Sequence, residues 1–181
     1  QNQLQLYLQP KIDLASGRVA GAEALVRWRH PARGLVPPAH FIPFAEQTGA
    51  IRQITQWMIE RTVIALAELH AQGLPLKIAV NLSTRDLMDQ NLPHKVARQL
   101  SQRGLGPAAL CLEITESAIM DDPLRAEQTL QGLHDMGVAL SIDDFGTGYS
   151  SLAYLKRLPV DQLKIDRSFV MNMERDRADV M

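Results

Sequence analysis

Short apolar segments of strand length alternate with helical patterns along most of this chain. Six segments rich in branched and apolar residues predict β-strands: residues 4–14, 19–28, 76–83, 110–117, 138–145 and 162–167. Helical spacing and helix start and stop residues predict four helices: residues 51–73, 93–103, 122–137 and 150–158. Strands that alternate with helices build a mainly parallel sheet, so the pattern restricts the chain to the α/β class.

The first two strand segments are joined by "ASGR", residues 15–18, which is short enough for a hairpin turn. We therefore expect these two strands to pair antiparallel. An open doubly wound sheet and a barrel both remain compatible with the later strands. No glycine-rich dinucleotide or P-loop fingerprint follows a strand, which weakens the nucleotide-binding form of the open sheet.

Composition sets the outer limits of the interpretation. The chain has 181 residues, of which 46% are hydrophobic, enough to bury the core of one domain over residues 1–181. Its net charge of −1 gives no sign of a polymeric nucleic-acid partner. Its apolar runs are too short for a membrane segment and its start lacks a signal peptide, so we expect a cytoplasmic location. The single cysteine, Cys111, lies in an apolar run and is expected to pack in the core.

Polar side chains stand late in five consecutive strand segments. They are Glu23, Asn81, Glu113, the adjacent pair Asp143 and Asp144, and Lys164. In a parallel barrel the carboxyl ends of the strands meet on one face, which is where catalytic groups lie. Each placement has a structural explanation when taken singly, such as a salt bridge of Glu23 with Arg27. Five equivalent placements favour one shared site.

These residue types offer oxygen ligands to a metal, and the five histidines show no zinc-type spacing. Oxygen-only sites suit Mg²⁺, Mn²⁺ or Ca²⁺. Two adjacent acids can bridge a pair of ions, which favours in-line attack at phosphorus. Lys164 then fits as an electrostatic partner of the attacking water or the phosphate, and Arg27 as a phosphate clamp. The pattern points to phosphoester hydrolysis.

At this point the residues resemble a known family. "EALVRW", which begins at Glu23, resembles the signature of EAL domains, bacterial phosphodiesterases that cleave cyclic di-GMP to linear pGpG. Six further motifs occur in the family's order: "YLQP" (7–10), "FIPFAEQTG" (41–49), "NLS" (81–83), "LEITES" (112–117), "DDFGTGYSSL" (143–152) and "LKID" (163–166). The set spans nearly the whole chain and is highly specific.

The resemblance implies a modified TIM (β/α)₈ barrel with an antiparallel first strand. It implies two Mg²⁺ or Mn²⁺ ions, held by Glu23, Asn81, Glu113, Asp143 and Asp144. It also implies that Lys164 orients or activates the attacking water, and that the substrate contacts are Gln9, Leu25 and Arg27. Glu116 and Gly146 would link the metal site to a homodimer interface through the "DDFGTGYSS" loop, and Asp166 belongs to the family's lysine–aspartate motif without a firm role.

The family pattern continues with a further metal-binding glutamate strand, so we expect the domain to be incomplete at the C-terminus of this chain. Relatives of this kind commonly carry sensor or GGDEF-type domains, and the parent protein is expected to be linked to one, with or without a membrane anchor. The alternative to an enzyme is a cyclic di-GMP receptor that binds without turnover. Receptors commonly carry broken metal motifs, whereas the motifs here are intact.

Overall fold

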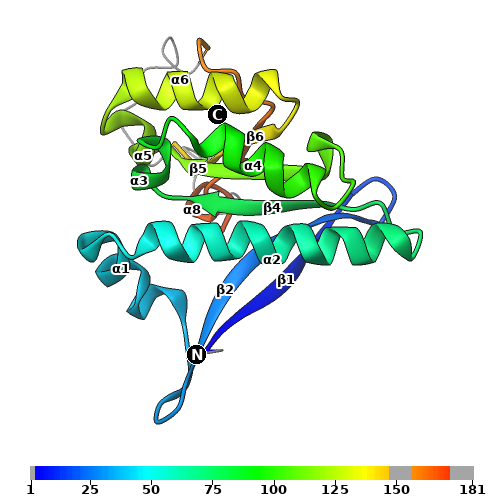
Figure 1. Ribbon diagram of the computed structural model, residues 1–181, viewed down its shortest axis with the longest axis horizontal. Helices are drawn as coiled ribbons and strands as arrows, with labels where there is room; N and C mark the ends of the chain where they lie inside the picture. Colours follow the sequence, from blue (N-terminus) through cyan, green and yellow to red (C-terminus); the bar gives the residue numbers. More distant parts are fainter. Residues whose placement is uncertain (1–2, 147–155, 172–181) are drawn as a thin grey trace.

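The computed structural model describes residues 3–146 and 156–171, which form one mixed sheet with helices packed against it (Figure 1). The strands run in the order β1-β2-β4-β5-β6-β7, and β3 pairs with β2. Their bounds are β1 Leu4–Ile12, β2 Val19–His30, β3 Gly34–Val36, β4 Lys77–Leu82, β5 Leu110–Thr115, β6 Ala139–Phe145 and β7 Gln162–Ile165. The helices are α1 Ile42–Thr48, α2 Ile51–Ala71, α3 Thr84–Leu87, α4 Leu92–Ser101, α5 Glu116–Met120, α6 Pro123–Asp135 and α8 Arg167–Met171, with 3-10 turns at Pro38–His40 and Pro107–Ala109.

The first two strands form an antiparallel hairpin, and all later neighbours along the path from β2 to β7 pair in parallel. The register sets Gln9 opposite Glu23, so both side chains lie on the same face of the hairpin. The parallel pairs β2–β4, β4–β5 and β5–β6 are each connected through described helices, as βα units require. The predicted α/β class, antiparallel hairpin and mainly parallel sheet are confirmed.

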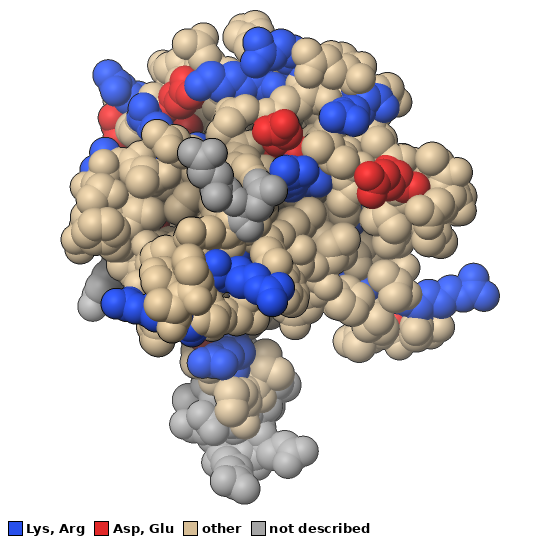
Figure 2. Space-filling model, turned by 60° about the horizontal axis from the view of Figure 1, so that its bottom comes forward, with Lys and Arg blue, Asp and Glu red and all other residues tan. Residues whose placement is uncertain are grey.

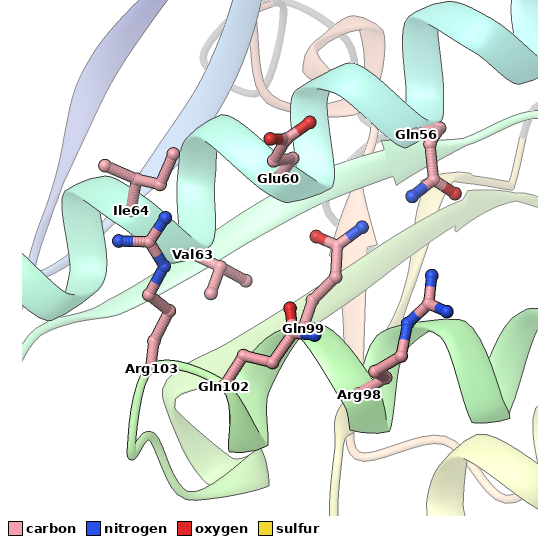
Figure 3. A pocket seen from close by; sticks show the side chains of 8 residues that line it. All are labelled: Gln56, Glu60, Val63, Ile64, Arg98, Gln99, Gln102 and Arg103. Carbon is pink, nitrogen blue, oxygen red and sulfur yellow. The ribbon is translucent and has the colours of Figure 1, made fainter.

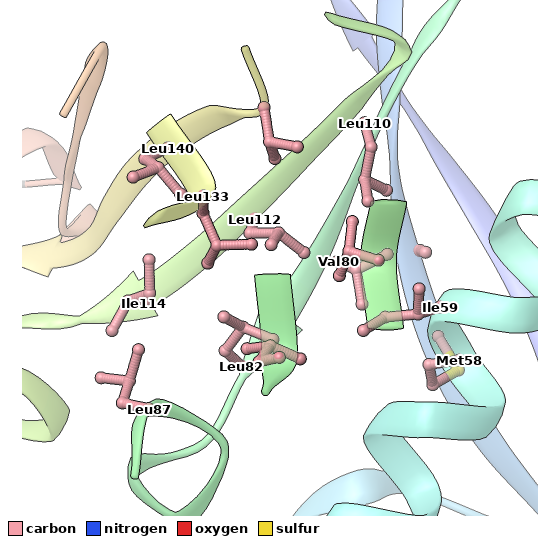
Figure 4. Packing of buried hydrophobic residues seen from close by; sticks show 14 of the residues in the cluster. Met58, Ile59, Val80, Leu82, Leu87, Leu110, Leu112, Ile114, Leu133 and Leu140 are labelled. Carbon is pink, nitrogen blue, oxygen red and sulfur yellow. The ribbon is translucent and has the colours of Figure 1, made fainter. Parts of the chain in front are cut away.

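One face of the sheet is covered by α2, α4 and α6, which lie side by side (Figure 1). Alternate residues of β5 point into this layer, and Leu110, Leu112 and Ile114 are fully buried there. Helix residues such as Ile59 and Leu133 close over them (Figure 4). Burial of each such side chain contributes about 1.5–3 kcal/mol, which makes this layer the main apolar core.

The opposite face of the same strands carries smaller and more polar side chains. Ala79, Cys111 and Ala139 form a separate small buried cluster, and Glu113 follows Cys111 two residues later on that face. Cys111 is buried, as predicted, and burial together with the nearby Glu113 carboxylate raises the pKa of its thiol to about 11. A thiol held neutral in this way acts as a packing residue.

Several elements differ from the sequence-based prediction. The short strand β3 and the helix α1 were not predicted, and α1 begins with a proline, Pro43, in its first turn. The strand predicted over 110–117 ends at Thr115, because the Thr115 hydroxyl accepts from the backbone N–H of Ala118 and starts α5. The helix predicted over 150–158 is wrong for residues 156–158, which form a turn, and the rest of it lies outside the described residues.

Among the described helices, none combines the length and apolarity needed to cross a bilayer.

Replacement of Leu112 by alanine should lower the free energy of unfolding by about 2–5 kcal/mol, because it opens a cavity under three helices. Leu124 on α6 is 74% exposed, so Leu124→Ala should change stability by no more than about 0.5 kcal/mol. Urea unfolding followed by circular dichroism measures both. Equal losses for the two variants would contradict the assignment of the core to this face.

Candidate functional site

The site is organised around the carboxylate of Glu113, which is completely buried on the inner face of β5. Lys11 on β1 donates to its Oε1 at 2.6 Å, and Lys164 on β7 donates to its Oε2 at 2.9 Å. A buried carboxylate is stable only when both oxygens find donors, and here each oxygen has its own ammonium group.

Lys164 connects Glu113 to two further acids. Its Nζ lies 2.7 Å from Asp143 Oδ2 and 3.3 Å from Glu23 Oε2. Asn81 Nδ2 donates to the other oxygen of Glu23 at 2.9 Å. The structure thus brings together five of the predicted site residues, which come from five different strands. Their catalytic and metal-binding roles stay predictions.

The charges in this cluster control each other. Burial opposes the charge on Lys164, but the hydrogen bonds to Asp143 and Glu113 outweigh that effect and raise its pKa above the ordinary lysine value. The side chain of Lys164 is therefore an ammonium group at neutral pH, placed between three carboxylates.

Asp144 lies beside this cluster but differs from Asp143 in backbone and surroundings. Its φ is 53°, in the left-handed region that costs a non-glycine residue about 1–3 kcal/mol, although aspartate tolerates it better than most. Its N–H donates to Asp143 Oδ1 at 2.9 Å. Partial burial and the neighbouring Asp143 charge raise the pKa of the Asp144 carboxyl. Asp144 thus departs from regular strand geometry, and it lies within the register shift of the β6–β7 pairing between Ile142 and Phe145.

The donor set fits a hard divalent cation. Ligand oxygens of Glu23, Glu113 and Asp143 lie within 4.8 Å of one another, and Asp144 is not part of that group. The Asn81 amide donates its N–H to Glu23, which leaves the amide oxygen as a further neutral ligand. Carboxylate and amide oxygens are ligands for Mg²⁺, Mn²⁺ or Ca²⁺, so the residues present suit the predicted metal chemistry.

The predicted substrate contacts lie on the β1–β2 hairpin on the same face as Glu23. Gln9 is opposite Glu23, and Leu25 and Arg27 follow at intervals of two residues, about 7 Å each. The Arg27 guanidinium lies over the ring of Tyr7 at 5.7 Å and donates to the carbonyl of Val26. These contacts fix the guanidinium against the β1–β2 hairpin. Its role toward a substrate stays a prediction.

The remaining predicted residues occupy the rim of the site. Glu116, the buried first residue of α5, accepts from the backbone N–H of Gly146 at 3.3 Å, while residues 147–151 of the predicted loop lie outside the described chain. Gly146 has a φ of 96°, and an added Cβ would approach the ring of Phe169 to 2.9 Å. Asp166 accepts from the N–H and hydroxyl of Ser168, which lowers its pKa and caps the start of α8.

Lys11 and Tyr7 are the residues of this face that the sequence analysis missed. Strand alternation could have found them, because both share a face with Gln9 on β1. Neither stands at the carboxyl end of a parallel strand, which was the criterion that selected the other candidates.

A cavity of about 280 Å³ adjoins the acid cluster. Its lining includes Leu25, Asn81, Pro38 and Ile42, and Glu46 provides an acidic group in an otherwise largely apolar wall. A flat, mostly apolar ligand group with hydrogen-bond donors along one edge suits this lining.

A second cavity of about 260 Å³ lies between α2 and α4, on the helix side of the sheet (Figure 3). It is lined mostly by polar side chains, and Gln99 points from α4 toward α2 within it. None of its lining residues belongs to the acid cluster. On the face drawn in Figure 2, the basic side chains stand in separate groups, and acidic side chains lie among them in the upper part of the view.

Comparison with known proteins gives a consistent relationship. A family profile described as EAL domain matches residues 1–180. Cyclic di-GMP phosphodiesterase NbdA of Pseudomonas aeruginosa is 47% identical over 180 residues, which are 99% of this chain and 23% of that protein. The bifunctional diguanylate cyclase/cyclic di-GMP phosphodiesterase MucR of the same species is 44% identical, over 98% of this chain and 26% of that protein. The chain thus spans about a quarter of the length of these two relatives.

Solved structures agree with this. The PaMucR phosphodiesterase in complex with c-di-GMP has a TM-score of 0.92 and 44% identity, over 98% of this chain and 72% of that chain. The EAL domain of FimX from Xanthomonas citri, in complex with c-diGMP, has a TM-score of 0.88 at 22% identity and shares the fold. The predicted modified TIM barrel with an antiparallel first strand is confirmed.

Loss of the Lys164 ammonium should destabilise the metal-free chain. We expect Lys164→Met to lower the free energy of unfolding by about 1–3 kcal/mol, less than for a fully buried pair because Lys164 is partly exposed. Because the raised pKa keeps Lys164 charged at every pH below the ordinary lysine value, the difference should stay constant between about pH 6 and pH 9.

Mg²⁺ should restore much of this loss, since it supplies the missing positive charge. Lys95 pairs with Asp89 on the surface, so Lys95→Met should change stability by less than about 1 kcal/mol, and this difference from wild type should be the same with and without Mg²⁺ because the acid cluster is intact. Urea unfolding with and without Mg²⁺ makes the comparison. Equal behaviour of the two variants would contradict a charge-balancing role for Lys164.

Proposed function

This chain belongs to the EAL domain family, and from that membership we propose that it hydrolyses one phosphodiester bond of cyclic di-GMP, giving linear pGpG, with divalent metal. The observation that carries the proposal is the convergence of Glu23, Glu113 and Asp143 around Lys164. The names of the NbdA and MucR relatives support the substrate. The complex of the PaMucR phosphodiesterase with c-di-GMP supports it further.

The proposed metal residues are Glu23, Asn81, Glu113 and Asp143, with Asp144 beside a second ion of Mg²⁺ or Mn²⁺. When bound, such ions activate a water molecule and polarise the phosphoryl oxygens. Lys164 holds a positive charge beside the same acids. Because its pKa is raised, orientation of the attacking water and stabilisation of the developing negative charge fit it better than proton abstraction.

The proposed recognition surface rises from the cluster along β2. Arg27 would clamp a phosphate, and Gln9 and Leu25 would contact the nucleotide. The cavity lined by Leu25 and Asn81 is of a kind that accepts a purine base. The Glu46 carboxylate at its wall would accept hydrogen bonds from the N1–H and the amino group of guanine, a pattern that adenine does not offer.

For the surroundings of the site we propose a homodimer, coupled to the metal through the loop that follows Asp144. The hydrogen bond from Gly146 to Glu116 supports this coupling, since it joins the strand that carries Asp143 to the end of the strand that carries Glu113. The domain would act in a cytoplasmic signalling protein. A link to a GGDEF-type domain is supported by the bifunctional name of the MucR relative.

The proposed activity is tested by chromatography of cyclic di-GMP incubated with the chain and Mg²⁺ or Mn²⁺. The assay should be made on the 181-residue chain and on a longer version that includes the further strand with the expected metal-binding glutamate. Glu23→Ala should remove turnover by losing a metal ligand. Lys164→Ala should lower turnover about 10²–10³-fold while cyclic di-GMP binding stays within about threefold, as expected for a group that acts mainly in the transition state.

Two results would contradict this. Binding of cyclic di-GMP by both versions without any pGpG would establish the receptor alternative. A loss of affinity in Lys164→Ala as large as its loss of turnover would assign Lys164 to binding.

Substitution at Glu116 or Gly146 should weaken dimerisation and the response to metal together. Glu116→Gln weakens the acceptor of the Gly146 N–H, and Gly146→Ala forces a Cβ against Phe169 at a φ that favours glycine. Sedimentation velocity with and without Mg²⁺ measures the effect, with Gly34→Ala as a control because an added Cβ there meets nothing within 4 Å at a similarly positive φ. Unchanged assembly in both site variants would remove the coupling.

A further inference from the structure

Lys11 contacts the acid cluster from a strand that carries none of the proposed metal ligands. It extends from β1 across the interior to Glu113, 102 positions away in the sequence, and forms a 2.6 Å bond to Oε1. Within the described part of the chain, Lys11 makes an ion pair with Glu113 alone, whereas Lys164 is shared among three acids.

The interior beneath Glu113 is shaped to admit the Lys11 side chain. Its cross-strand neighbour is Gly21, where an added Cβ would lie 2.6 Å from the Lys77 carbonyl oxygen. Gly21 is therefore required by the close approach of β2 to β4, and it leaves space beside Lys11. The small side chains of Ala79 and Cys111 border the same space, a cavity of about 120 Å³.

The two lysines divide the oxygens of Glu113 between two sides. Oε2 faces Lys164 and the other acids, which is the side where a cation would enter and compete with Lys164. Oε1 accepts from Lys11, which makes no ion pair with Glu23 or Asp143. A cation that took the place of Lys164 at Oε2 would not have to displace Lys11 from Oε1.

We propose that Lys11 selects the metal: by holding Oε1, it restricts Glu113 to one-oxygen coordination and so favours Mg²⁺ or Mn²⁺ over Ca²⁺. Mg²⁺ takes six ligands in near-octahedral geometry, which single carboxylate oxygens and water satisfy. Ca²⁺ takes six to eight ligands and gains from carboxylates that bind through both oxygens. A Glu113 with one oxygen occupied by an ammonium group withholds that second oxygen. This inference rests on the metal site of the proposed function and adds a residue that discriminates among ions.

The test is calorimetric titration of the full chain with Mg²⁺ and with Ca²⁺ in the absence of substrate. Lys11→Met should raise the affinity for Ca²⁺ relative to Mg²⁺ by roughly tenfold or more, within the range seen when outer partners of metal ligands are changed. Lys11→Arg keeps a cationic donor to Oε1 and should keep the wild-type ratio. Lys77→Met is the matched control, because Lys77 lines the same cavity and makes no ion pair with a described residue.

Three results would overturn the inference. The first is an unchanged ratio of Ca²⁺ affinity to Mg²⁺ affinity in Lys11→Met. The others are a change of this ratio in Lys77→Met as large as in Lys11→Met, and a wild-type chain that binds neither ion. If Lys11→Met does not fold, infrared spectra of the wild-type chain decide. The splitting of the carboxylate stretches of Glu113, isolated by difference against Glu113→Gln, should indicate one-oxygen coordination with Ca²⁺ as well as with Mg²⁺. Two-oxygen coordination of Ca²⁺ would refute it.

These titrations contain no cyclic di-GMP, so their outcome is independent of the hydrolysis assay. A chain that shows the predicted ion ratios but does not cut cyclic di-GMP refutes the proposed activity and leaves the selection by Lys11 standing. A chain that cuts cyclic di-GMP while Lys11→Met keeps the wild-type ratio of Ca²⁺ to Mg²⁺ affinity supports the proposed activity and refutes the selection by Lys11.

Discussion

The burial of one carboxylate sets the requirements for the rest of the interior. Glu113 is entirely shielded from water, and an isolated charge in that position would cost several kcal/mol or would be neutralised by a proton. Two ammonium groups from opposite edges of the sheet, Lys11 and Lys164, bind its two oxygens. Their long aliphatic chains need space, which the small residues Ala79 and Cys111 next to Glu113 provide. The buried carboxylate therefore requires both the two lysines and the small side chains that make room for them.

Strand alternation lets this charged interior coexist with a conventional apolar core. On β5, Leu110, Leu112 and Ile114 pack against helices, while Cys111 and Glu113 face the other side. A shift of the register by one residue would exchange these environments and place Glu113 among leucines. The apolar layer in Figure 4 thus fixes the direction of the acid side chain as firmly as its ion pairs do.

Much of this arrangement follows from the sequence alone. The strand-end positions of Glu23, Asn81, Glu113, Asp143 and Lys164 predicted their convergence, because parallel strands present equivalent ends at one edge. The contact of Lys11 with Glu113 could not be derived in this way. It depends on how far β1 twists across the interior and on the space beside Gly21, which only the assembled sheet defines. The end of β5 at Thr115 was missed for a local reason, since a threonine side chain caps the next helix where the apolar pattern still reads as strand.

The formal charge of the acid cluster can be compared with the charge of the phosphodiester that the chain is proposed to bind. Three carboxylates, Glu23, Glu113 and Asp143, and two ammonium groups, Lys11 and Lys164, leave a formal charge of −1. One divalent ion added to this set brings the formal charge to +1, which complements the single negative charge of a phosphodiester. A bound ion would compete with Lys164 for the three acids, and the Lys164 ammonium group would then be available to the proposed substrate. Under the proposed selection by Lys11, that lysine would keep its bond to Oε1 of Glu113 with and without the ion, so the two lysines that both bind Glu113 here would have different tasks once a cation is bound.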